Sequence, residues 1–104
     1  MFQFFDNLAD LGLSEGSSAI DVVRALPTGS ILLFEIVYNS GWISSGMPDG
    51  YLNGGLLEII HLGSRYIIRF TRQSINSIAT PDLYLGSVAS SNPTEITWKK
   101  VTLA

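Results

Sequence analysis

Residues 56–71 constrain the fold most, because they read as a β-hairpin whose strands carry apolar side chains on both faces. Gly63 occupies the first central position of a two-residue turn, where a type II′ conformation suits glycine. This turn places Glu58 opposite Arg69. A sheet built on such a hairpin needs a cover on each side. A short chain can cover one side with its own elements, and an identical chain is the simplest cover for the other, so we expect an oligomer.

The amino-acid composition also indicates that a partner covers part of the protein surface. The 104 residues fit one domain, and only 14% of them are charged, against roughly 25% in an ordinary soluble domain. The net charge of −3 provides no basic field for phosphates, so we expect no nucleic acid partner. No apolar run reaches transmembrane length, so we expect no membrane insertion.

The organisation of the chain changes at Pro27. Before it, apolar spacing predicts a short helix over 5–11, ended by Gly12, and capping signals predict a second helix that starts after Ser18 and ends at Leu26. After it, we expect strands at 31–38, in the hairpin, at 83–85 and at 96–101. The predicted fold is mainly β: a small antiparallel β-sandwich-like head with one or two short N-terminal helices. Residues 1–26 would form a helical neck and residues 27–104 a β-rich knob, in one compact domain.

The loop at 39–55 is longer than most compact domains contain, which makes it the first place to look for binding. Its aromatic rings and short polar groups suit the apolar faces and hydroxyl edges of sugars. The structural alternative is that Trp42 pins the loop to the core, the commoner situation for an aromatic residue in a glycine-rich loop. The candidate receptor-binding or glycan-binding residues are Trp42, Asp49, Tyr51 and Asn53.

Few residues suggest catalysis. His61 is the only histidine, and the hairpin register places it beside Tyr66 on the more apolar face, where a hydrogen-bonded core histidine is the commoner situation. Without cysteine, one chain cannot form an ordinary zinc site, and no serine lies in a Gly-x-Ser-x-Gly motif. We expect no enzyme, no catalytic residue, no metal and no cofactor. Glu58 and Arg69 are expected to form a structural ion pair that fixes register and partner orientation.

Four segments follow one another over nearly the whole chain: Leu-Gly-Leu at 11–13, Leu-Pro-Thr-Gly-Ser at 26–30, Tyr-Ile-Ile-Arg at 66–69 and Thr-Trp-Lys-Lys-Val at 97–101. In this order they resemble the C-terminal knob region of tail fibres of tailed bacteriophages and R-type pyocins. The resemblance implies a homotrimeric, mainly β head at a fibre tip, which recognises a host surface polysaccharide or outer-membrane protein. It also implies a place in the virion tail, after synthesis in the bacterial host cytoplasm.

Two other functions stay open. One is a structural trimerisation or carbohydrate-binding module at the end of a polysaccharide-degrading tailspike. The other is a module that only locks three fibre chains in register, in which alanine at Trp42 or Tyr51 lowers stability and leaves host adsorption unchanged. Multivalency favours receptor binding, since three weak sites on one rigid head gain avidity.

Overall fold

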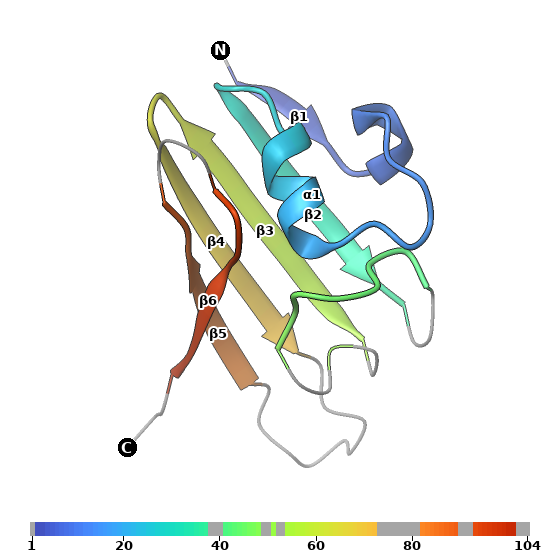
Figure 1. Cartoon of the computed structure of the whole chain (residues 1–104), viewed down its shortest axis with the longest axis vertical. Coiled ribbons are helices and arrows are strands. Elements are labelled where there is room, and N and C mark those ends of the chain that lie inside the picture. Colours follow the sequence, from blue (N-terminus) through green and yellow to red (C-terminus); the bar gives the residue numbers. More distant parts are fainter. Residues whose placement is uncertain are drawn as a thin grey trace.

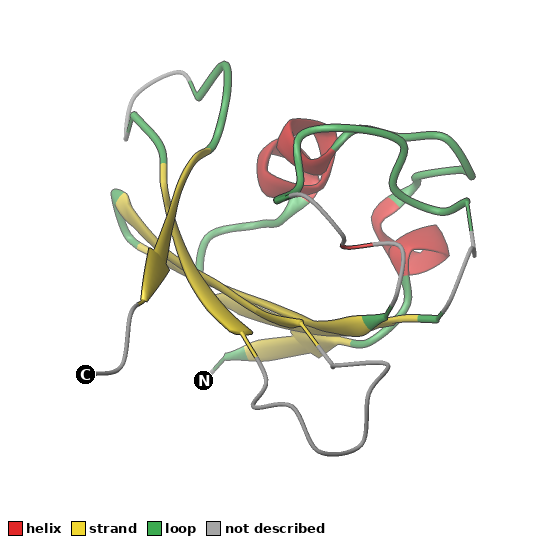
Figure 2. Ribbon diagram, turned by 90° about the horizontal axis from the view of Figure 1, so that it is seen from below, coloured by secondary structure: helices red, strands yellow, loops and turns green. Residues whose placement is uncertain are grey.

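The computed structural model describes residues 2–37, 41–48, 51, 54–72, 82–89 and 93–101. They form one six-stranded sheet in which strand order follows chain order (Figure 1). A 3-10 helix, η1 (Leu8–Leu11), and an α-helix, α1 (Ala19–Ala25), lie over one face, and the sheet curves toward them (Figure 2). The expected mainly β class with short N-terminal helices is confirmed. The strands are β1 (Gln3–Phe5), β2 (Ser30–Ile36), β3 (Gly55–Leu62), β4 (Arg65–Arg72), β5 (Asp82–Ser87) and β6 (Thr97–Val101).

The N-terminal segment differs from the prediction. Instead of a helix over 5–11, β1 pairs in parallel with β2, and only Leu8–Leu11 is helical. Asn7 explains the boundary: its backbone is extended, and its side chain accepts a hydrogen bond of 2.8 Å from the N–H of Ala9, which starts a new helix there. Gly12 ends that helix in the left-handed conformation, as predicted.

The second predicted helix is confirmed as α1. Its start is a capping box, in which the Ser18 hydroxyl accepts a hydrogen bond from the N–H of Asp21 and the Asp21 carboxylate accepts one from the N–H of Ser18. Leu26, just before a proline, ends the helix in an extended conformation. Val22 and Val23 are fully buried against the sheet, and each buried side chain of this kind contributes roughly 1.5–3 kcal/mol.

The register of the β3–β4 hairpin is confirmed, with Glu58 opposite Arg69. The predicted type II′ turn is wrong, because Gly63 does not adopt a positive φ. Side-chain alternation is sufficient to set the register, since it buries Ile59 and Ile68 together on the helix side of the sheet.

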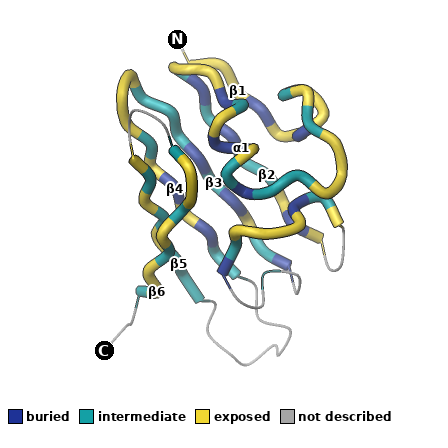
Figure 3. The backbone as a smooth tube through the Cα atoms, viewed as in Figure 1, coloured by how far each residue is buried: buried dark blue, intermediate teal, exposed yellow. Residues whose placement is uncertain are grey.

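The layer opposite the sheet is built from helices and loops rather than from a second sheet (Figure 2). Residues 2–26, the expected neck, share one core with the β-rich part, because Phe5 and Leu8 are buried with the central strands (Figure 3). The Trp98 indole N–H donates a hydrogen bond of 2.6 Å to the carbonyl of Gly46, which ties β6 to the loop that crosses the core. The fold therefore has one well-covered face of the sheet.

Candidate functional site

The two described loop candidates are held against the core. Trp42 and Tyr51 are partly buried and pack on the hydrophobic cluster. The Tyr51 hydroxyl donates a hydrogen bond of 2.9 Å to the carbonyl of Ile43, whose side chain is buried. Asp49 and Asn53 lie outside the described residues. For Trp42 and Tyr51 the geometry therefore favours the anchoring alternative over a free stacking platform.

Residues 41–45 of this loop form hydrogen bonds to the segment before α1 and to its first residue. The Ser44 hydroxyl donates to the carbonyl of Gly16 at 2.6 Å, and the N–H of Ala19 donates to the carbonyl of Ser45 at 2.8 Å. The loop remains exposed at Ser44 and Ser45 while its backbone is anchored. Residues 41–48 lie on the helix side of the sheet (Figure 2).

The opposite face of the sheet has a different character. Side chains alternate between faces along each strand, so those that point away from α1 are identified by the register. Most of them are apolar, and no described helix or strand covers them (Figure 2). We call this surface the open face; its apolar members are Phe4, Ile31, Leu33, Leu56, Ile60, Leu62, Ile67, Leu83, Leu85 and Val101. Four of these are exposed large hydrophobic side chains: Phe4, Leu56, Ile67 and Leu85.

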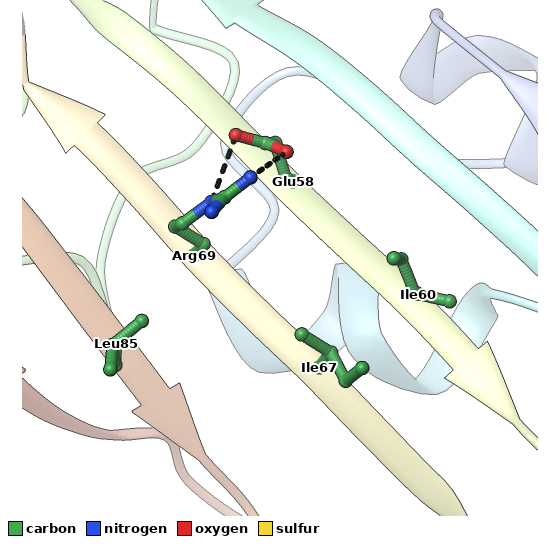
Figure 4. A pocket seen from close by; sticks show the side chains of 5 residues that line it. All are labelled: Glu58, Ile60, Ile67, Arg69 and Leu85. Carbon is green, nitrogen blue, oxygen red and sulfur yellow. Dashed lines mark hydrogen bonds and ion pairs between the residues drawn. The ribbon is translucent and has the colours of Figure 1, made fainter.

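An ion pair lies in the middle of the open face. Arg69 donates from Nε to Oε1 of Glu58 at 3.2 Å and from Nη2 to Oε2 at 2.9 Å, a two-pronged geometry that raises the pKa of the guanidinium. Figure 4 shows this pair beside Ile60 and Ile67, with Leu85 on the neighbouring strand. The same residues line a shallow hollow of about 150 Å³. The open face therefore combines an apolar surface with one positive and one negative group at its centre.

A second charged cluster lies where β4 ends and β5 begins. Arg72 donates a hydrogen bond to Asp82, and the ammonium of Lys100 lies 3.4 Å from the same carboxylate. Burial raises the pKa of Asp82, but the hydrogen bond and the charge of Arg72, with the charge of Lys100, hold this pKa below its usual value. The sequence analysis did not predict this cluster. Its three residues come together only because β4 pairs with β5 and β5 pairs with β6, and local sequence patterns do not show which strands pair.

Among the described residues, no group of three His, Asp or Glu side chains is placed to hold a metal ion. Within the same part of the chain, neither helix has the length and apolar character needed to cross a bilayer. Comparisons with known protein families, with curated proteins and with solved structures find no match.

Proposed function

We propose that this domain is the homotrimeric tip of a tail fibre from a bacteriophage or pyocin-like particle, in which the open faces of three copies pack together. The assembled head would bind a host cell-surface receptor, either a polysaccharide or an outer-membrane protein. One observation carries the proposal: a broad apolar sheet face has no cover among the described elements. Water disfavours such a surface, and a second copy removes it from water without any other partner.

The size of the open face suits a subunit interface. Six strands spaced by about 4.8 Å, about six residues long on average, give the whole face, polar members included, roughly 600 Å² in flat projection. Accessible surface exceeds projected area, since side chains stand out from the sheet. Stable interfaces bury roughly 800 Å² of accessible surface on each partner, whereas the largest apolar patch of a monomer is roughly 300–600 Å². The open face therefore lies at the upper end of the patches that monomers expose and approaches the area that a stable interface needs.

The curvature of the sheet favours three copies over two. Because the sheet curves toward α1, the open face is convex (Figure 2). Two convex faces touch only along their midlines. Three convex faces around an axis each touch two neighbours, so that both halves of every face are buried.

Receptor binding is supported by the order of the four sequence segments at 11–13, 26–30, 66–69 and 97–101, which resembles tail-fibre knobs. It is also compatible with the arrangement of the elements. The anchored loop lies on the helix side, so packing through the open face leaves it on the outside of the trimer (Figure 2). Three copies of one loop surface can act together on a repetitive glycan.

The purely structural alternative is favoured by one observation, the packing of Trp42 and Tyr51 against the core. In that alternative, the trimer locks three fibre chains and contacts no receptor. The structural alternative and the receptor-binding proposal both include a trimer that packs through the open face. Only a measurement of receptor binding distinguishes the two functions.

The first test is the mass of the protein in solution, measured by light scattering over a wide concentration range. We expect three times the 11.3 kDa chain mass. A folded monomer at high concentration would overturn the proposal. The second test is binding of the trimer to a panel of bacterial surface polysaccharides and outer-membrane preparations, with an Ile67→Lys variant as a monovalent control. Binding that falls steeply in the control supports receptor recognition, and a trimer that binds nothing supports the structural alternative.

A further inference from the structure

The hydrogen bonds between Glu58 and Arg69 do not use all the donors of Arg69 or all the acceptor positions of Glu58. A guanidinium carries more N–H groups than the two used here, and each carboxylate oxygen can accept more than one hydrogen bond. The Arg69 side chain is 49% exposed and that of Glu58 is 22% exposed, so water reaches the remaining groups in the isolated chain. The surrounding hollow offers only apolar neighbours, Ile60, Ile67 and Leu85.

When a partner covers the open face, the Glu58–Arg69 pair loses its contact with water. Once water is excluded, the unused N–H groups of Arg69 need acceptors, because unpaired polar groups in an apolar interface are costly. A purely apolar partner surface would leave these groups unpaired. A second copy brings a carboxylate with unused lone pairs to the same place, since Glu58 occupies the same position on its sheet. The centre of the open face is thus complementary to itself.

The direction of the pair determines how the copies fit. Glu58 is on β3 and Arg69 is directly opposite on β4, so the line from cation to anion runs across the strands. Where three sheets pack with their strands along a common axis, this line runs around the axis. The cation of one sheet then points toward the anion of the next, and the sequence of contacts closes after three copies.

Resting on the proposed trimer, we infer that Arg69 of each chain also donates a hydrogen bond to Glu58 of the partner subunit next to it. The contacts form a closed ring of alternating charge around the threefold axis. This ring sets the rotational register of the three sheets, while the apolar residues on either side supply most of the driving force. The occupant of the hollow is therefore a second copy of this chain.

Charge reversal tests the ring. Glu58→Arg gives a chain with two positive side chains at this site, and Arg69→Glu gives a chain with two negative ones. We expect each variant alone to associate at least about tenfold more weakly than the wild type, because like charges meet at the axis. Arg65→Glu is the matched control, since it makes the same charge change on the same face at the exposed end of β4, and we expect less than about a twofold change.

Mixing the two reversal variants separates contacts between chains from contacts within a chain. In any mixed ring of three, two of the three contacts join opposite charges and one joins like charges. We therefore expect the mixture to recover association in part, whereas the double variant Glu58→Arg/Arg69→Glu recovers it fully. Sedimentation velocity measures association, and far-ultraviolet circular dichroism shows that each variant keeps its sheet. If a reversal variant loses that signal, Glu58→Gln replaces it, and we expect weaker association from that variant as well.

The outcomes distinguish this inference from the proposed function. A trimeric wild type whose reversal variants assemble normally would overturn the ring and leave the trimer standing. Recovery in the double variant without any recovery in the mixture would show that the pair acts only within a chain, which also overturns the ring. A monomeric wild type would overturn the proposed function itself.

Discussion

Ile67 and Ile68 are adjacent isoleucines on opposite faces of β4, and replacing each with alanine tests the open face directly. Ile67 is 52% exposed on the open face, and Ile68 is 2% exposed in the core. The same chemical change therefore removes atoms from two different environments. In a monomer, only Ile68→Ala has a large effect on stability. In the proposed trimer, Ile67→Ala has its own effect, on association.

The structure sets the size of each effect. Full burial of an isoleucine side chain contributes about 1.5–3 kcal/mol, so covering the exposed half of Ile67 contributes about 1 kcal/mol per subunit. Three subunits together lose about 3 kcal/mol in Ile67→Ala, which lowers the association constant of the trimer roughly a hundredfold. Ile68→Ala leaves a cavity in the core and lowers the free energy of unfolding by about 2–5 kcal/mol.

Sedimentation equilibrium over a dilution series measures the first effect, and urea unfolding at a fixed protein concentration measures the second. We expect Ile67→Ala to shift the dilution midpoint of the trimer. We expect Ile68→Ala to lower the free energy of unfolding. At low temperature, this variant should still form the trimer. If Ile67→Ala leaves the dilution midpoint unchanged, the open face is not a subunit interface and the reasoning fails.

Four further variants test the fold and the loop. Gly86→Ala should lower the free energy of unfolding by about 1–3 kcal/mol, because the added methyl would lie 2.9 Å from two neighbouring side chains. Gly63→Ala, with open space and no positive φ, should change it by less than about 1 kcal/mol in the same urea experiment. Hydrogen bonds from the backbone and side chain of Ser18 lower the pKa of Asp21. The ionised Asp21 carboxylate therefore stabilises the fold at pH values above its ordinary pKa. This stabilisation is lost as the pH falls through the lowered pKa of the folded state. Ser18→Ala removes the hydroxyl and keeps the backbone N–H that donates to Asp21, so it should cost about 1 kcal/mol and raise that pKa only in part, as followed by NMR titration; an unchanged free energy of unfolding would contradict the role of the capping box. Tyr51→Phe removes the hydroxyl donor and should cost about 1 kcal/mol without changing receptor binding, whereas lost binding at unchanged stability would make Tyr51 a receptor contact.

Local signals were sufficient for several elements. The cap at Ser18 and the restricted residue before Pro27 defined α1, and Gly12 marked the end of η1. The alternation of side chains defined the β3–β4 register even though the turn conformation at Gly63 differs from the prediction. Each of these features depends on residues close together in the chain.

Features that depend on distant residues were not predicted. The strand Gln3–Phe5 is too short for a pattern of its own and exists because β2 offers it a parallel partner. The cluster of Arg72, Asp82 and Lys100 needs three strands in register. For the loop, sequence reasoning recognised both roles of Trp42 but could not decide between them, since the choice depends on packing against a core assembled from the whole chain.

The charged residues at the centre of β3 and β4 also bear on the life of a newly made chain. Without these two residues, segments 56–60 and 66–70 would each be an uninterrupted apolar run of high β-propensity, the kind that associates with other unfolded chains. Glu58 interrupts the first and Arg69 the second, as gatekeeper residues do in aggregation-prone stretches. In the proposed trimer, these two residues would therefore also reduce aggregation of a newly synthesised subunit before it assembles.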